Sequence, residues 1–234
     1  MAGDRKLPSK SGQSEVDSFL KKVAAAPAVR PAGERGRLVF AMDATASREP
    51  TWDQACHIQA EMFRETAALG GLEIQLVYYR GFGEFKAGSW ATTADALLRT
   101  MTGVMCLAGH TQIGKVLKHA IAETKAKKVD ALVFVGDCLE EDIDQLGRLA
   151  GELGLLGVPC FMFHEGRDDV AAKAFQQIAR LSGGAFCRFD ASSPKQLRDL
   201  LSAVAVYAAG GRKALADFSA RHGGVAARLT HQVK

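Results

Sequence analysis

Short apolar runs alternate with longer amphipathic stretches over most of this chain. Runs of strand length occur at residues 38–42, 73–79, 131–135, 158–163 and 185–189, with a weaker one at residues 84–87. Stretches with helical spacing of apolar residues separate them, beginning at Thr51 and then at residues 93–102, 112–125, 140–152, 168–181, 194–207 and 212–220. This alternation predicts the α/β class, with a doubly wound, mostly parallel sheet and helices on both of its faces.

The central runs, such as "LVFAM" and "ALVFV", are apolar throughout. Strands covered on both faces have this composition, whereas half-exposed strands alternate apolar and polar residues, so we expect three layers, α/β/α. In open sheets of this kind, ligands bind outside the carboxyl ends of the strands, where the winding reverses. The loops that can carry a site are therefore those after Met42, Tyr79, Val135 and Phe163.

The 234 residues, 47% of them hydrophobic, suit one globular domain with additional ends. Residues 1–36 are predicted to form a flexible N-terminal extension with a short helix at residues 14–23, because the opening stretch is polar and rich in Lys, Ser and Gly. The domain itself is predicted at residues 37–208. Residues 209–234 are predicted to form a C-terminal helix and tail.

Charge and cysteine content narrow the class of protein. The formal net charge of +4 comes from bases spread along the chain, which argues against a nucleic-acid groove. The five cysteines are odd in number and never form a C-x-x-C pair, as is typical of reduced thiols. The opening stretch lacks the apolar core of a signal peptide, and no segment approaches the ~18 apolar residues of a membrane span. We therefore expect a cytoplasmic protein that does not enter a membrane.

Oxygen-bearing side chains gather where the first strand is predicted to end. In "DATAS", Asp43, Thr45 and Ser47 are spaced by two, so in an extended segment their side chains point the same way. Three oxygens do not fill the roughly octahedral shell of Mg²⁺, so other loops or water must complete it. Thr111 in "GHTQIG" and Asp137 in "VGDC" are the candidates.

These three motifs, in this order, resemble the von Willebrand factor A (VWA) family. Its metal-ion-dependent adhesion site (MIDAS) takes D-x-S-x-S after the first strand, a threonine before a central helix and an aspartate after the fourth strand. The resemblance covers about residues 37–207. Thr45 stands where the family has serine, and Ala46 and Cys138 replace common glycines. The resemblance implies a Rossmann-like VWA fold and a site for Mg²⁺, or for Mn²⁺ or Ca²⁺, with these ligands: Asp43, Thr45, Ser47, Thr111 and Asp137.

By the same resemblance, the function is binding of another protein and not catalysis. An Asp or Glu carboxylate of the partner fills an open position on the metal, as at the family's adhesion site. The rim that selects the partner is expected to include Arg48, Glu49, Phe82, Phe85, His110, Glu140 and Glu165. Family analogy suggests an adaptor in an assembly with an AAA+ ATPase, a chaperone or a stress-response complex.

Other readings of the same residues stay open. Asp43, Thr45 and Ser47 can bond turn backbone, Thr111 can cap the helix that follows it, and Asp137 can cap the next one. A Mg²⁺-dependent hydrolase or phosphatase would use Asp43 as nucleophile, but such chemistry commonly needs a second carboxylate where Thr45 stands. A scaffold with an empty site is a third reading. The sequence does not identify the partner, the metal or the oligomeric state.

Overall fold

The computed structural model describes residues 35–66, 71–189 and 194–222 of the chain. Residues 1–34 of the predicted N-terminal extension, with its helix at residues 14–23, lie outside the described residues, as do residues 223–234 of the predicted C-terminal helix and tail. Gly36, the last residue of the predicted extension, is instead the first residue of the first strand. The domain boundaries therefore stay predictions. None of the described helices combines the length and the apolar character needed to cross a bilayer.

A single sheet runs through the middle of the described part. Its strands are β1 (Gly36–Asp43), β2 (Leu72–Arg80), β3 (Glu84–Ala91), β4 (Ala131–Gly136), β5 (Cys160–Glu165) and β6 (Ala185–Phe189). They lie in the order β3-β2-β1-β4-β5-β6, and only β3 is antiparallel to its neighbour. The predicted strand at residues 84–87 continues to Ala91, because it pairs with β2 along the sheet's edge.

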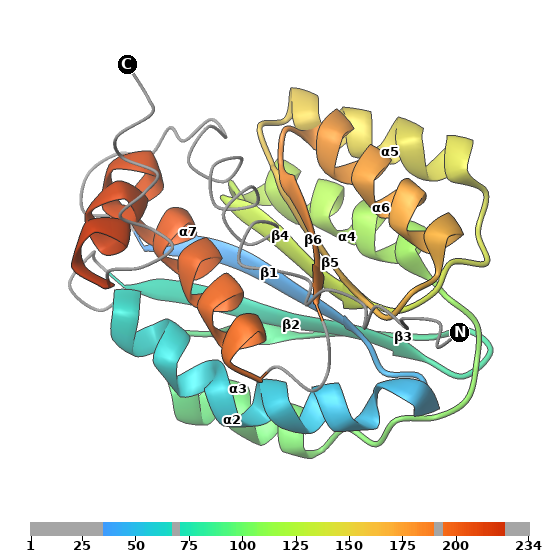
Figure 1. The fold of residues 1–234 in the computed structure, drawn as a ribbon, viewed down its shortest axis with the longest axis horizontal. Coiled ribbons are helices and arrows are strands. Elements are labelled where there is room, and N and C mark those ends of the chain that lie inside the picture. Colours follow the sequence, from blue (N-terminus) through green and yellow to red (C-terminus); the bar gives the residue numbers. More distant parts are fainter. Residues whose placement is uncertain (1–34, 67–70, 190–193, 223–234) are drawn as a thin grey trace, which may run out of the picture.

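Helices cover both faces of this sheet, and their bounds are α2 (Glu49–Thr66), α3 (Ala94–Thr102), α4 (Ile113–Ala126), α5 (Ile143–Leu155), α6 (Asp169–Ser182) and α7 (Pro194–His222). Figure 1 shows α2, α3 and α7 together on one face and α4, α5 and α6 on the other. The predicted three-layer α/β/α architecture is confirmed. The two helices predicted at residues 194–207 and 212–220 form α7, which bends at Gly211, where φ is +68°.

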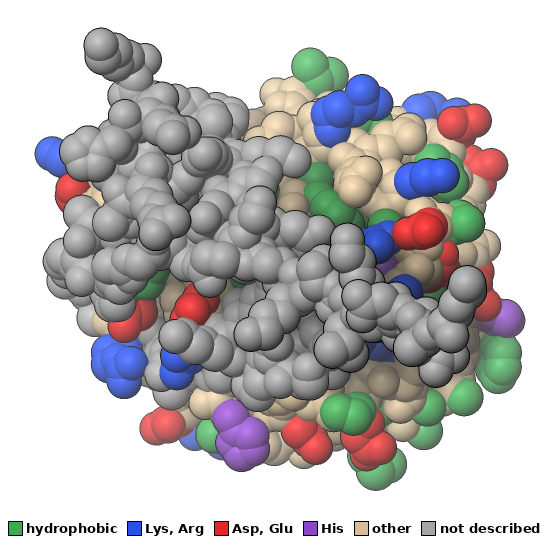
Figure 2. All heavy atoms as spheres, viewed as in Figure 1, with side chains coloured by type: hydrophobic (Ala, Val, Ile, Leu, Met, Phe, Trp, Pro, Cys, Tyr) green, Lys and Arg blue, Asp and Glu red, His purple; other side chains and the backbone are tan. Residues whose placement is uncertain are grey.

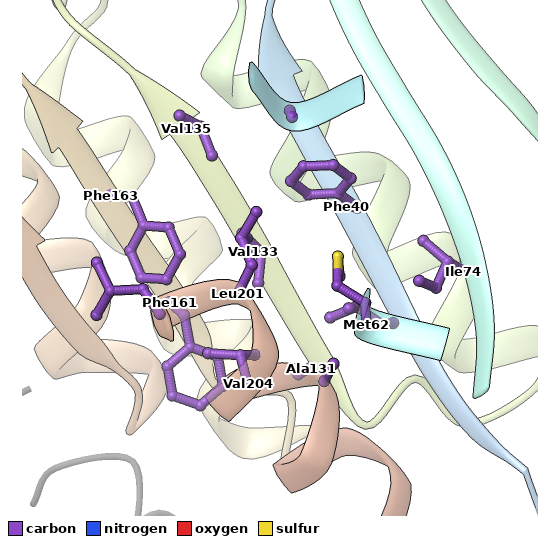
Figure 3. Close-up of a cluster of buried hydrophobic side chains, with 14 of the residues drawn as sticks. Phe40, Met62, Ile74, Ala131, Val133, Val135, Phe161, Phe163, Leu201 and Val204 are labelled. Atoms are coloured by element: carbon purple, nitrogen blue, oxygen red, sulfur yellow. The ribbon is translucent and has the colours of Figure 1, made fainter. Parts of the chain in front are cut away.

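Two hydrophobic cores, one on each face, hold the layers together. Along β1, Phe40 points to the face of α2, α3 and α7, and the next residue, Ala41, points to the opposite face. Figure 3 shows Phe40, Val133 and Phe161 from three strands beside residues of α7. Full burial of a side chain of this size contributes about 1.5–3 kcal/mol, so the apolar strand runs dictate the layering.

Charges on the outside are mixed in sign. On the visible face in Figure 2, the described Lys and Arg side chains are interspersed with Asp and Glu.

The strand order places the reversal of winding between β1 and β4. From β1 the chain adds β2 and β3 on one side, and then β4, β5 and β6 on the other. Asp43 is the last residue of β1, and Asp137 directly follows β4. The two carboxylates therefore meet at the switch point of the sheet, where such folds bind ligands.

Candidate metal site

Asp43 is a fixed, buried carboxylate at the end of β1. Its side chain is 0% exposed, and Oδ1 accepts a 2.7 Å hydrogen bond from the amide of Thr45. Oδ2 accepts a 3.0 Å bond from the hydroxyl of Tyr79, which lies beside Asp43 on β2. Burial raises the pKa of Asp43 above its ordinary value, and these bonds oppose that rise. Asp43 thus bonds turn backbone, as one alternative reading expected, and also faces the site.

Ser47 joins the loop after β1 to the loop after β4. Its hydroxyl donates a 2.7 Å hydrogen bond to Oδ2 of Asp137, and Thr45 Oγ1 lies 3.4 Å from Ser47 Oγ. Ser47 is exposed, so the group opens to solvent. Four of the five expected ligands, Asp43, Thr45, Ser47 and Asp137, therefore form one connected group.

Thr111 is attached to the same loop by a reciprocal pair of bonds. The Thr111 amide donates a hydrogen bond to Oε2 of Glu140, and the Thr111 hydroxyl accepts one from the amide of Glu140. Each donor–acceptor distance is 3.0 Å. A hydroxyl oxygen that accepts one bond retains a second lone pair for a cation. The structure thus fixes the loop carrying Thr111 against the loop carrying Asp137.

The helix-capping alternatives for Thr111 and Asp137 are wrong. The N-cap residue of α4 is Gln112, and the amides of Ile113 and Gly114 donate to the carboxylate of Glu141, the second at 2.8 Å. The next helix, predicted to begin at residue 140, begins at Ile143, because the side chain of Asp142 caps it.

The helix predicted to begin at Thr51 is α2, which begins two residues earlier, at Glu49. The Thr51 hydroxyl donates a hydrogen bond to the carboxylate of Glu165.

Cys138 lies close to Asp43 and Asp137, and the sequence analysis did not include it among the candidate ligands. One metal-ligating atom from each of Asp43, Asp137 and Cys138 lies within 4.8 Å of the others. Burial, and then the negative charges of Asp137 and Asp43, raise the pKa of the Cys138 thiol to about 12. Its position directly after Asp137 was the available signal.

Arg48 is not a rim residue, and that prediction was wrong. Arg48 is the last residue of a short 3-10 helix, Ala46–Arg48. Its side chain is 1% exposed and forms an ion pair with Glu165. Burial lowers the pKa of Arg48, and the charges of Asp137 and Asp43 oppose that effect. The positive charge of the Arg48 guanidinium offsets the repulsion between the two aspartates.

His164 holds the loop after β4 through a hydrogen bond to Asp137, and the sequence analysis did not include it among the site residues. Its side chain is fully buried on β5, and Nε2 lies 3.0 Å from the carbonyl oxygen of Asp137, to which it donates. Burial lowers the pKa of His164, and the hydrogen bond to Asp137 opposes that effect.

Several of the other rim residues are exposed. Phe82 is 82% exposed and packs edge-on against His110, which in turn lies 3.0 Å from Glu140. Glu49 is exposed, whereas Phe85 is half-buried against His119 of α4 and Glu165 is held by Arg48.

Two exposed apolar residues on the loop after α3 extend this rim, and the sequence did not single them out. Met105 and Leu107 are 69% and 43% exposed. The amide of Leu107 donates to the carbonyl of Ala44, and Arg80 donates to the carbonyl of Met105. The loop is thereby held beside the end of β1.

The donor set fits a divalent cation. Carboxylate and hydroxyl oxygens converge, and Oδ1 of Asp137 is buried without a hydrogen-bond donor among the described residues. Buried carboxylate oxygens normally have a partner, so this atom is available to a cation.

Solved structures with the same fold include VWA domains. The VWA domain of SpRpn10 matches with a TM-score of 0.57 and 16% identity, over 72% of this chain and 94% of that chain. Proximal thread matrix protein 1 from the mussel byssus, in a structure with a zinc-occupied MIDAS motif, matches with a TM-score of 0.60 and 15% identity, over 76% of this chain and 47% of that one. The PilB minor pilin of Streptococcus sanguinis matches with a TM-score of 0.54 and 10% identity, over 75% and 62%.

At these identities the likeness concerns the fold, and the predicted VWA fold is confirmed. This chain spans about half the length of the byssus protein. No protein-family model matches the chain, and no curated protein matches it at a significant level.

Proposed function

We propose that this chain, which has the VWA fold, is a metal-dependent protein-binding module. In this proposal a divalent cation, taken first as Mg²⁺ with Mn²⁺ or Ca²⁺ as alternatives, is held by Asp43, Thr45, Ser47, Thr111 and Asp137. An Asp or Glu carboxylate of a protein partner then occupies the position that these side chains leave open. The cation's charge is only partly offset by the aspartates and so favours an acidic ligand.

The observation that carries the proposal is the bond from Ser47 to Asp137, beside an Asp137 oxygen that has no donor among the described residues. It supports the idea that residues far apart in the sequence converge on one cation. Because Ser47 is exposed, a partner could reach that cation from solvent.

The surface beside the site suits a protein partner. Phe82, Met105 and Leu107 are exposed on loops that bond to the segments around Asp43 and Thr111. Exposed apolar residues next to a polar centre are typical of interaction sites. An adaptor role in the cytoplasm, within an AAA+ ATPase, chaperone or stress-response assembly, is part of the proposal by family analogy.

The burial of Asp43 argues against the hydrolase alternative. A nucleophilic carboxylate must reach its substrate, whereas Asp43 is 0% exposed and both of its oxygens accept hydrogen bonds. No carboxylate stands at position 45 to act as acid and base.

Calorimetric titration of the chain with MgCl₂ or MnCl₂ tests the metal step. Wild type and the control Asp144→Asn, which changes an exposed aspartate of α5, are expected to bind. Asp43→Asn and Thr111→Ala are expected to lose binding. Wild type that gives no binding heat and no metal-dependent rise in melting temperature would overturn the proposal in favour of an empty scaffold.

The partner step is tested by capture with and without chelator. Proteins bound by wild type in MgCl₂ are expected to be released by chelator and to be absent with Asp43→Asn. Replacing one acidic residue of the identified partner by its amide should abolish binding. Capture that is indifferent to chelator would contradict the proposed mode of recognition.

A further inference from the structure

A thiol lies among the oxygen atoms of the candidate metal site. Cys138 and the carboxylates of Asp43 and Asp137 each offer one ligand atom, and the three atoms lie within 4.8 Å of one another. Among the described residues, no other group of three metal-ligating side chains is this close. We propose that Cys138 is a direct ligand and makes the site select a zinc-class cation over Mg²⁺ and Ca²⁺. This inference rests on the proposed metal site and refines it.

The ligand types favour this assignment. Mg²⁺ and Ca²⁺ are hard cations bound by oxygen alone, and neither gains from sulfur. Zn²⁺ binds thiolate and carboxylate ligands with tetrahedral geometry, and thiolates raise selectivity for it. A zinc site that must admit an outside ligand takes three protein ligands and leaves the fourth position open. Asp43, Asp137 and Cys138 supply three.

The surroundings hold Cys138 at this place. It follows Asp137, whose carbonyl accepts a bond from His164 and whose Oδ2 accepts one from Ser47. Glu140, two residues further on, is bonded to Thr111 through both backbone and side chain. The loop is therefore fixed on both sides of the thiol, and little rearrangement is needed before a cation binds.

The other thiols of the chain do not share this position. Cys160 and Cys187 are buried in the core, and Cys56 and Cys106 are half-buried. Cys106 lies on the loop that bonds to Ala44, outside the group of three, and is the matched control.

Binding through sulfur has a defined proton balance. A bond between the cation and Cys138 Sγ replaces the S–H bond, and the proton passes to the buffer. No oxidant or reductant takes part. The number of protons released on binding is therefore a readout of the thiol that is independent of partner binding.

The test compares wild type, Cys138→Ser, Cys138→Ala and Cys106→Ser as reduced, metal-free chains of residues 1–234. Each is titrated with ZnCl₂, CoCl₂ and MgCl₂. Wild type and Cys106→Ser should bind Zn²⁺ more tightly than Mg²⁺ and show a thiolate-to-cobalt charge-transfer absorption with Co²⁺. Both Cys138 variants should lose that absorption, and their Zn²⁺ affinity should fall at least about 10–100-fold. A fall of that size is typical when a residue that bonds to a metal ligand is replaced, and loss of a ligand should cost no less. Their Mg²⁺ affinity should fall by a smaller factor than their Zn²⁺ affinity.

The outcomes separate this inference from the proposed function. Cys138 variants that bind Zn²⁺ and Co²⁺ like wild type overturn the inference, and the oxygen site stands if Asp43→Asn still abolishes Mg²⁺ binding. Wild type that binds none of the three ions overturns both. Equal melting temperatures of the metal-free variants show that each has folded, and Cys138→Ala supports the result if Cys138→Ser does not fold.

Discussion

The hydroxyl of Ser47 donates a 2.7 Å hydrogen bond to Oδ2 of Asp137, across a separation of 90 residues in the chain. This bond connects the loop after β1 with the loop after β4, the two neighbouring strands at the sheet's switch point. Because both groups are also expected cation ligands, the contact marks the place where a cation would replace a hydrogen bond.

Replacing Ser47 by alanine removes this hydroxyl. Since Ser47 is exposed, the free energy of unfolding without metal should change by less than about 0.5 kcal/mol. The affinity for Mg²⁺ should fall by at least about 10-fold, as for loss of a contact to a metal site. Calorimetry measures the affinity, and Ser89→Ala, an exposed serine of β3, is the control. Equal losses in both variants would contradict a role for Ser47 in the site.

Arg48→Met should be among the most destabilising changes near the site. It leaves Glu165 without its buried counter-charge, and breaking such a pair costs about 3–5 kcal/mol. The double variant Arg48→Met/Glu165→Met removes both charges and should recover part of that loss. Urea denaturation of the two variants measures the difference. A double variant no more stable than the single one would mean that the ion pair is not the cause.

The pH dependence of metal-free stability should reveal Asp43. Its pKa is raised in the fold, chiefly by burial, so the folded state holds the proton more tightly than the unfolded state. Ionisation of Asp43 therefore costs stability as the pH rises from the ordinary carboxyl pKa through the folded one. Asp43→Asn should raise the melting temperature of the metal-free chain at pH 7, with a smaller gain at lower pH. An unchanged or lower melting temperature at pH 7 would contradict this.

Glu141 should stabilise α4 as a cap supplied by another loop. Its carboxylate accepts hydrogen bonds from the backbone amides of Ile113 and Gly114. The N-cap residue, Gln112, makes no capping hydrogen bond with its own side chain. Glu141→Ala should cost about 1–2 kcal/mol, like loss of a strong N-cap. Glu152→Ala, which breaks an exposed ion pair with Lys125, should cost about 0.5 kcal/mol or less and serves as control. Denaturation curves that do not distinguish the two would refute the capping role.

The fold could be predicted because each strand carries its own signal. Apolar runs such as residues 131–135 need both faces covered whatever their neighbours are, so a local pattern defines a layer. The order of Asp43, Thr111 and Asp137 along the chain then suggested the VWA fold.

Other contacts could not be predicted, since they depend on residues that meet only after folding. Arg48 is polar and follows a turn, so the sequence placed it on the surface, and only Glu165 at the end of β5 explains its burial. The sequence predicted Glu141 in the first turn of a helix at residues 140–152, yet its carboxylate caps α4. Cys138 stood out only as a departure from glycine, and its role in the group follows from the approach of β1 to β4.

A crystal structure of the chain grown with MnCl₂, with anomalous scattering recorded at the manganese edge, tests whether the loops after β1 and β4 hold one cation. We expect a single strong peak between Asp43, Ser47 and Asp137, with the Ser47 hydroxyl turned from Asp137 to the ion. A map without a peak there, with Ser47 still bonded to Asp137, would contradict it.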